Sequence, residues 1–128
     1  MKDLTQIINI LLLVLTINLQ LANAEDKKDQ ILIFVSFSMN DSALQKYFKE
    51  ASLVGAKLVI RGLINNSFMA TRQKMQQLKI NIEIDPNKFE EYRIKRVPAI
   101  VVVSDQIIKK ITGHLPLASA LEIMEKDQ

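Results

Sequence analysis

Two serines and the single histidine are the side chains with which this sequence could carry out covalent chemistry. Ser38 and Ser42 lie in a polar stretch, Ser36 to Ser42, that directly follows the apolar run Ile31 to Val35, while His114 lies near the other end of the chain. A serine hydroxyl becomes a nucleophile when a histidine accepts its proton. No G-x-S-x-G elbow surrounds either serine, and no carboxylate is identified that would orient the imidazole. A serine hydrolase using Ser42 and His114 is therefore the weaker interpretation.

The composition excludes several other kinds of site. The chain of 128 residues has no cysteine and one histidine, which rules out thiol redox chemistry, cysteine metal sites and multi-histidine metal sites. The formal net charge of +3 is not concentrated in a basic block, so we expect no nucleic-acid binding. No residue pattern indicates a cofactor or a small-molecule substrate.

Residues 1–24 have the pattern of a secretory signal peptide. Lys2 precedes the apolar stretch Ile7 to Leu21, and the tripeptide Ala22 to Ala24 matches the small-x-small cleavage pattern. We expect cleavage after Ala24, a linker over residues 25–30, and contact with the membrane only before cleavage. An uncleaved membrane anchor is the alternative, although polar residues interrupt a segment that is short for the roughly 20 apolar residues of a spanning helix.

Residues 31–128 are predicted to form one domain in which strands and helices alternate. The stretches Ile31 to Phe37 and Lys57 to Ile64 have the apolar character of strands that are covered on both faces. After Pro98, residues 99–103 and 106–112 predict an antiparallel hairpin. A strand–helix–strand unit crosses over right-handed, so the first two strands should be parallel. The expected fold is therefore α/β, with a mixed sheet of about four strands flanked by helices.

Capping residues and apolar spacing locate the helices between these strands. Either Asn40 or Asp41 can cap a helix that ends at Gly55, and Asp85 should cap a short helix that begins with Pro86. Turn and cap chemistry is expected from Asn65, Asn66 and Ser67, and the inward face of the helix that follows them is expected to consist of Phe68, Met75 and Leu78. A final helix has its apolar positions at Leu117, Leu121 and Met124.

Several stretches resemble known proteins. "EYRIKRVPAIVVV", residues 91–103, is similar to the thioredoxin segment in which a proline leads into an apolar strand; in that fold this proline, here Pro98, is cis. "IFVSFSMNDSALQ", "LVIRGLINNSF" and "IEIDPNKFEEYRIKRVPAIVVV" together resemble the TrbC family of F-type conjugation proteins. Asn40 stands where a proline is expected in the first motif of that family. Because asparagine also caps helices, the helix start should be kept.

The resemblance implies a thioredoxin-like fold with the strand order 2-1-3-4 and a cis-proline loop. It places Met39 and Ser42 where disulfide isomerases have their paired cysteines, so the redox chemistry of that position is absent. It also implies an exported periplasmic protein that is not an enzyme and that is needed to assemble an F-type conjugative pilus, part of a type IV secretion transfer apparatus. The implied partners are other transfer proteins, notably of the TraW type.

We expect a polypeptide-binding surface at the end of the sheet. Ligands bind beyond the carboxyl ends of parallel strands. In thioredoxin-like proteins the backbone of the residue before the cis-proline, here Val97, pairs with an extended partner peptide. Arg61 either contacts the partner or holds the Met39 loop by hydrogen bonds to carbonyl groups, and we favour the second role. The candidate protein-binding residues are Ser38, Met39, Asn40, Ser42, Arg61, Val97 and Pro98.

Two further interpretations concern the same surface. A general periplasmic chaperone would hold unfolded chains in the same groove, and it is the alternative to a dedicated assembly protein. Arg93, Lys95 and Arg96 form a basic cluster near Pro98. We interpret this cluster as a solvated face, or else as a patch that steers an acidic partner toward the groove.

Overall fold

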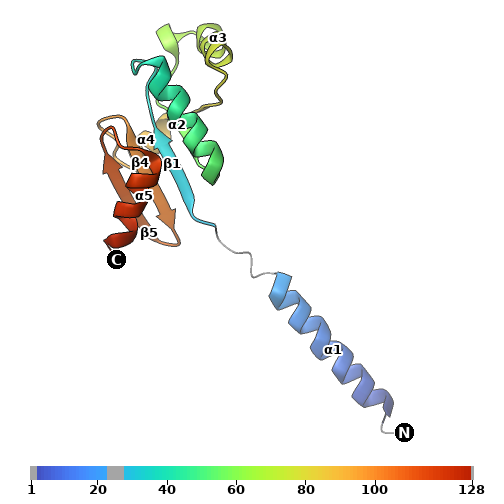
Figure 1. The fold of residues 1–128 in the computed structure, drawn as a ribbon. Coiled ribbons are helices and arrows are strands. Elements are labelled where there is room, and N and C mark those ends of the chain that lie inside the picture. The colour runs from blue at the N-terminus through green and yellow to red at the C-terminus, as the bar shows by residue number, and fades with distance from the viewer. Residues whose placement is uncertain (1–2, 23–27, 128) are drawn as a thin grey trace.

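The computed structural model describes residues 3–22 and 28–127, and the second segment folds around a five-stranded sheet (Figure 1). The predicted alternation of strands and helices is present. In chain order the elements are α1 (Asp3–Ala22), β1 (Gln30–Phe34), α2 (Asp41–Val54), β2 (Lys57–Ile60), the 3-10 turn η1 (Ile64–Asn66), α3 (Phe68–Leu78), β3 (Glu83–Ile84), α4 (Pro86–Glu91), β4 (Ala99–Ser104), β5 (Ile107–Thr112) and α5 (Leu117–Lys126).

The strands are arranged in the order β3-β2-β1-β4-β5. β1 is parallel to β2 and antiparallel to β4, while β2 is parallel to β3 and β4 is antiparallel to β5. The four predicted strands, which are β1, β2, β4 and β5, have the predicted order and directions, so the mixed sheet of the thioredoxin-like fold is confirmed. The predicted number is wrong by one, because Glu83 and Ile84 pair with Val59 and Ile60 and add β3 at the edge. Two residues are too few for the strand periodicity to show in the sequence.

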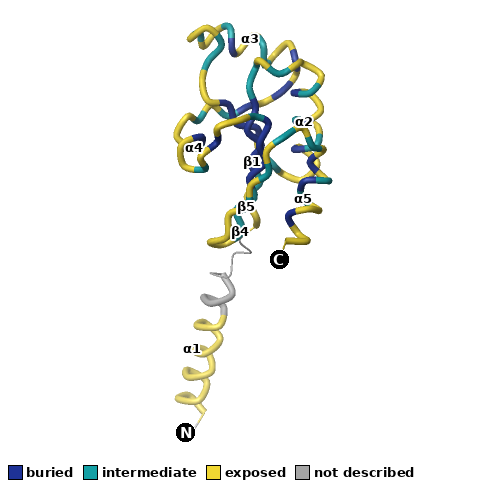
Figure 2. Tube along the Cα trace, turned by 90° about the vertical axis from the view of Figure 1, so that its left-hand side faces the viewer, coloured by how far each residue is buried: buried dark blue, intermediate teal, exposed yellow. Residues whose placement is uncertain are grey.

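β1 is the central strand, and it is buried on both faces (Figure 2). Side chains alternate along a strand, so Ile33 packs in the larger apolar cluster with residues of α2 and α5. Phe34 packs in a smaller cluster on the other face, where its ring meets the ring of Phe89 from α4 edge-on, with 4.9 Å between the centroids. This double burial explains why the run Ile31 to Val35 is apolar throughout.

Helices α2 and α5 pack in the same cluster, and two hydrogen bonds join α2 to the first residue of α5 and to the loop before it. The Glu50 carboxylate of α2 accepts the N–H of Leu117, the first residue of α5, at 2.8 Å, and the Tyr47 hydroxyl donates to the Leu115 carbonyl at 3.0 Å. The N-cap of α5 is Pro116, which provides no side-chain acceptor. Glu50 therefore satisfies a backbone donor that the start of α5 leaves open. Burial raises the pKa of the Tyr47 hydroxyl above its ordinary value, which favours the protonated form that donates this hydrogen bond.

The predicted ends of α2 and α4 are confirmed. Asn40, and not Asp41, is the N-cap of α2, since its side-chain oxygen accepts the N–H of Ala43 at 2.7 Å. Gly55 ends α2 with a positive φ of 71°, a conformation that glycine adopts without steric cost. Asp85 caps α4, with Pro86 as its first residue.

The η1 turn and the start of α3 are held by Thr71, a buried residue that the sequence pattern does not single out. Its hydroxyl donates to the carbonyl of Ser67 at 2.8 Å and accepts the N–H of Ile64 at 2.9 Å. Between these two partners, Asn65 and Asn66 have positive φ, which asparagine adopts more readily than most residues with a side chain. As expected, Ser67 caps α3. Thr71 thus fixes the turn that follows β2.

The predicted inward face of α3 is wrong at one position. Leu78 is buried and Met75 packs against the larger cluster, but the side chain of Phe68 is 62% exposed. Phe68 is the first residue of α3, and Thr71 takes the buried position one turn later. Helical periodicity indicates which face points inward, but it does not indicate where along the helix the core ends.

Helix α1 covers most of the predicted signal peptide. Its side chains from Asp3 to Ile17 are exposed. Among the described residues, no helix combines the length and the apolar character that crossing a bilayer would require. The predicted cleavage point after Ala24 and residues 25–27 of the predicted linker lie outside the described residues.

Replacing Thr71 by valine tests how the η1 turn is held. The change keeps the size of the side chain but removes both hydrogen bonds, so the Ile64 N–H loses its acceptor. We expect the free energy of unfolding, measured by urea titration, to fall by about 1–3 kcal/mol. Thr112→Val, at an exposed position of β5, is the control and should change it by less than about 0.5 kcal/mol. Equal stability of the two variants would contradict this role of Thr71.

Candidate functional site

A groove of about 490 Å³ lies beyond the carboxyl ends of β1 and β2. It brings together Ser38, Arg61 and Val97, three of the predicted site residues that are far apart in the chain. Parallel strands direct the residues that follow them to one edge of the sheet, which explains this convergence. The lining comes from three segments: Val35 to Ser38, Ile60 to Asn65, and the α4–β4 region with Phe89, Ile94, Lys95 and Val97.

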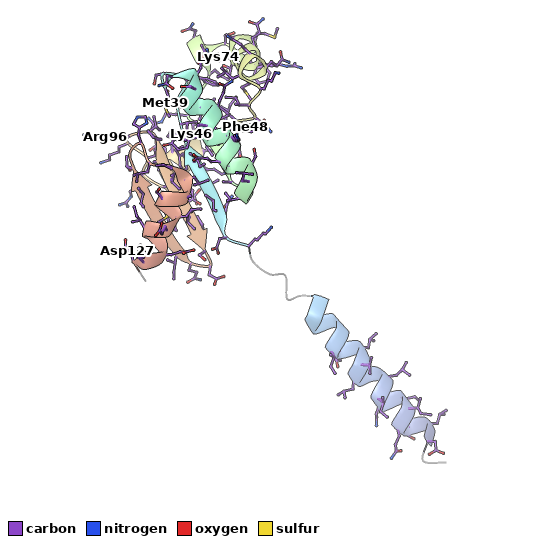
Figure 3. The ribbon with its side chains drawn as sticks, in the orientation of Figure 1. Met39, Lys46, Phe48, Lys74, Arg96 and Asp127 are labelled. Carbon is purple, nitrogen blue, oxygen red and sulfur yellow. The ribbon has the colours of Figure 1, made fainter. Side chains whose placement is uncertain are left out.

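Residues 36–42, here called the joint, lead from β1 into the start of α2 and begin with a closed turn. The Ser36 carbonyl accepts the N–H of Met39 at 3.0 Å, and the hydroxyls of Ser36 and Ser38 are hydrogen-bonded at 2.9 Å. Met39 lies at the start of α2 (Figure 3) and packs, half-buried, against the larger apolar cluster. Met39 is not among the residues that line the groove. Met39 therefore attaches the joint to the apolar core and does not face the groove.

Asn40 and Ser42 form the cap of α2. The Ser42 hydroxyl donates to the Asn40 side-chain oxygen at 3.0 Å, and the same oxygen accepts the N–H of Ala43. Neither residue lines the groove. The position that the resemblance matches to the paired cysteines of disulfide isomerases is therefore a hydrogen-bonded helix start.

The geometry gives no support to a serine–histidine pair. His114 is exposed and lines a separate cavity of about 190 Å³ together with Tyr47 and Glu50. Within the described part of the chain, no hydrogen bond joins His114 to Ser38 or Ser42, whose hydroxyls bond to Ser36 and Asn40. A serine nucleophile needs a proton acceptor in this place, and this arrangement does not provide one.

Arg61 fixes the wall of the groove that leads to β4. Its guanidinium donates to the carbonyl of Ile94 at 3.0 Å and lies over the ring of Phe89, 5.1 Å from the centroid. The expected hydrogen bond to a carbonyl is present, but the expected partner is wrong, because Arg61 holds the segment before Pro98 and not the Met39 loop. Both segments approach the same edge of the sheet, so the sequence could not decide between them.

The Val97–Pro98 peptide bond is cis, as the resemblance implied. Pro98 is buried, and its carbonyl accepts the N–H of Gly113 at 2.9 Å. Val97 is half-buried and lines the groove. In the part of the chain that the structure describes, the backbone of Val97 makes no hydrogen bond. Its N–H and C=O can therefore pair with an extended segment.

Residues outside the predicted set also shape this site. Lys110 of β5 donates to the carbonyls of Tyr92 and Arg93, at 3.2 Å each, and so holds the segment between α4 and β4. No sequence signal identifies a lysine of a predicted hairpin as a partner of these carbonyls. The basic cluster of Arg93, Lys95 and Arg96 is exposed, and Lys95 lines the groove. The described residues contain no group of three or more potential metal ligands.

Solved structures share the fold of this chain. StoA from Bacillus subtilis superposes with a TM-score of 0.57, at 17% identity, over 79% of this chain and 85% of its own. A candidate thioredoxin from Neisseria meningitidis superposes with a TM-score of 0.47, at 13% identity, over 77% of this chain and 73% of its own. At 17% identity the likeness to StoA concerns the fold alone, and the topology derived above agrees with it.

Sequence comparison identifies the family. The periplasmic protein TrbC of Escherichia coli (strain K12) is 34% identical over 109 residues, which cover 80% of this chain and 51% of the relative. The chain thus spans about half the length of the relative that it matches. The model of a family described as type-F conjugative transfer system pilin assembly protein matches residues 33–122, a range that includes the joint and the groove. The chain therefore belongs to the TrbC family of F-type conjugative transfer system pilin assembly proteins.

Proposed function

We propose that this protein is exported to the periplasm and is required, without catalysing a reaction, for assembly of an F-type conjugative pilus. The match of residues 33–122 to the family model carries the proposal, because the members of that family are described as pilin assembly proteins. The relative from Escherichia coli is a periplasmic protein, and the signal-peptide pattern of residues 1–24 points to the same compartment. The expected linker, residues 25–30, is then one residue shorter, because Gln30 is already part of β1. The working domain, expected over residues 31–128, has no Cys-x-x-Cys motif.

The groove beyond β1 and β2 is the proposed contact with other transfer proteins. An extended segment of the partner pairs with the open backbone of Val97, and its side chains lie against Ser38 and Arg61, which line the same groove. Backbone pairing gives affinity in this mode of recognition, and the side-chain contacts give specificity.

Four further residues are assigned to the site because they maintain its shape. Met39 supports the joint from the apolar cluster, and Asn40 with Ser42 caps the helix that the joint leads into. Pro98 positions Val97 next to the groove and is anchored through its carbonyl. A change at any of these positions is expected to move the groove wall.

The proposed partners are other conjugative transfer proteins. The TraW type is the first candidate, on the basis of the family resemblance. Lys95 in the lining, with Arg93 and Arg96 nearby, gives the groove a basic rim that favours an acidic partner segment. No cofactor, nucleic acid or small-molecule substrate forms part of the proposal.

Export with cleavage predicts a mature protein that begins at Glu25. Ala24→Leu places a bulky side chain before the cleaved bond, where a small residue is needed, and should leave the precursor uncut. Asn23→Leu, between the two small residues, is the matched control and should still be processed. N-terminal sequencing and the mass of the exported protein check both. An uncut wild-type protein would favour the membrane anchor instead.

A transfer system that lacks this protein should produce few pili and few transconjugants. Expression of the full chain should restore both, as measured by electron microscopy and mating counts. Normal piliation in the absence of the protein would contradict the proposed function. If the purified protein suppressed aggregation of many unrelated unfolded chains, the general chaperone would be favoured over a dedicated assembly protein.

Val97→Pro removes the backbone N–H that we propose pairs with the partner, whereas Val97→Ala keeps it. We expect Val97→Pro to weaken capture of a TraW-type protein at least about fivefold, while Val97→Ala retains most of it. Urea unfolding shows whether each variant is folded. A folded Val97→Pro variant that captures its partner normally would remove the groove from the proposed mechanism.

A further inference from the structure

The outer edge of β5 has no partner strand in the described part of the chain. β5 is the last strand in the sheet order and pairs with β4 alone. In an antiparallel ladder, alternate residues direct their N–H and C=O groups away from the partner strand. Ile107 and Ile108, which follow the hairpin turn, are 62% and 58% exposed. Unless something blocks it, such an edge is a template for another strand.

The two lysines of β5 do not block this edge. Lysines on edge strands commonly prevent strand addition because their charges project past the edge. Here the Lys109 ammonium donates to the carbonyl of Met124 on α5. The Lys110 ammonium donates to the carbonyls of Tyr92 and Arg93, beyond α4. Both charges are therefore held over the faces of the sheet, and the backbone edge between them stays accessible.

A second groove, of about 550 Å³, begins at the same strand and runs between the sheet and α5. Its apolar lining consists of Ile31, Val102, Ile107, Leu121 and Met124. Its polar lining consists of three carboxylates, Asp29, Glu125 and Asp127, together with Ser104 and Lys109, whose ammonium is bound to the Met124 carbonyl. The Asp29 carboxylate already accepts a hydrogen bond from Ser104, which leaves Glu125 and Asp127 as the carboxylates that a ligand can engage.

This second groove is separate from the groove beyond β1 and β2. Figure 3 places Asp127 at the opposite end of the sheet from Met39 and Arg96. The two grooves share no lining residue, and their linings differ in charge: Arg61 and Lys95 line the first, whereas three carboxylates and one cation, Lys109, line the second. The two surfaces therefore select for different partner segments.

We propose that the β5 edge binds an extended segment of another polypeptide, one that carries an apolar residue and a basic residue on the same face. The segment adds to the sheet as an edge strand, and its apolar side chain enters the second groove beside Ile107. A lysine or arginine two positions away points to the same face of the sheet and reaches Glu125 and Asp127. The acidic rim of this groove is what selects a basic segment.

A second copy of this chain is a poor occupant of the same edge. In a symmetric antiparallel dimer centred on Lys109 or on Lys110 of β5, that lysine lies directly opposite the same lysine of the other chain. Like charges directly opposite each other destabilise a strand pair. A segment of a different protein has no such restriction.

A designed peptide tests the proposal with the full-length protein. The probe is a short capped peptide of β-favouring residues with a leucine and, two positions later, a lysine; in the matched peptide a glutamate replaces that lysine. We expect amide exchange along β5 to slow when the first peptide is added, and its affinity to exceed that of the second by about tenfold. Equal affinities, or binding that leaves β5 exchange unchanged, would overturn the proposal.

Two charge reversals on α5 separate the groove from a general effect of charge. Glu125 lines the groove, whereas Glu122 does not and pairs with Lys126. Glu125→Lys should weaken binding of the first peptide by about tenfold, and Glu122→Lys by less than about twofold. Equal effects of the two changes would overturn the proposal. Val97→Pro should leave this binding unaltered, so the two proposed surfaces can fail independently.

Sedimentation of the protein alone tests whether a second copy of this chain occupies the β5 edge. We expect a monomer at the concentrations used for the peptide measurements. Ile108→Lys adds a charge at the β5 edge, and Leu53→Lys adds one at an exposed position of α2. A dimer that Ile108→Lys dissociates and Leu53→Lys does not would assign the edge to a second copy and overturn the proposal.

Discussion

Burial of β1 on both of its faces is the constraint on which the rest of the structure depends. Ile33 is enclosed by the cluster of α2 and α5, while Phe34 is enclosed by the cluster that contains Phe89. Because both faces are covered, the strand cannot shift by one residue without moving every side chain into the wrong cluster. A polar residue in place of Ile33 or Phe34, both fully buried, would find no water and would cost several kcal/mol. The end of β1 is thereby fixed, and with it the point at which the polar joint begins.

The joint lies where the resemblance to disulfide isomerases would place a redox site, but it contains no thiol. In a redox protein of this fold, the start of the helix after the first strand stabilises a thiolate. Here the same helix start is occupied by the Asn40 cap and the Ser42 hydroxyl. On the opposite wall of the groove, the Arg61 guanidinium donates a hydrogen bond to the Ile94 carbonyl and lies over the ring of Phe89. The walls are therefore held by hydrogen bonds and packing, neither of which requires a cysteine.

Local patterns in the sequence were sufficient for most of the fold and for part of the site. The parallel pairing of β1 with β2, the Asp85 cap and the choice of Asn40 or Asp41 as the cap of α2 follow from strand composition, the crossover and capping chemistry. The full strand order and the place of Val97 beside the groove were implied by the family resemblance. What could not be predicted depends on pairs that are distant in the chain: the two-residue strand β3, the choice of the Ile94 carbonyl by Arg61, and the bonds of Lys110. Hydrophobic periodicity contains no information about which distant carbonyl a long cationic side chain reaches.

The bond from Glu50 to the first residue of α5 makes the carboxyl-terminal part of this chain dependent on an early helix. Since α5 begins without a side-chain cap of its own, its first turn is complete only when α2 is in place, and Tyr47 adds a second link to the same region. Opening of α5 and of α2 should therefore be coupled, with both helices belonging to one cooperative unit. The final hairpin and helix do not form a separable module: in a hybrid with a relative, they would have to be exchanged together with the α2 face that completes them.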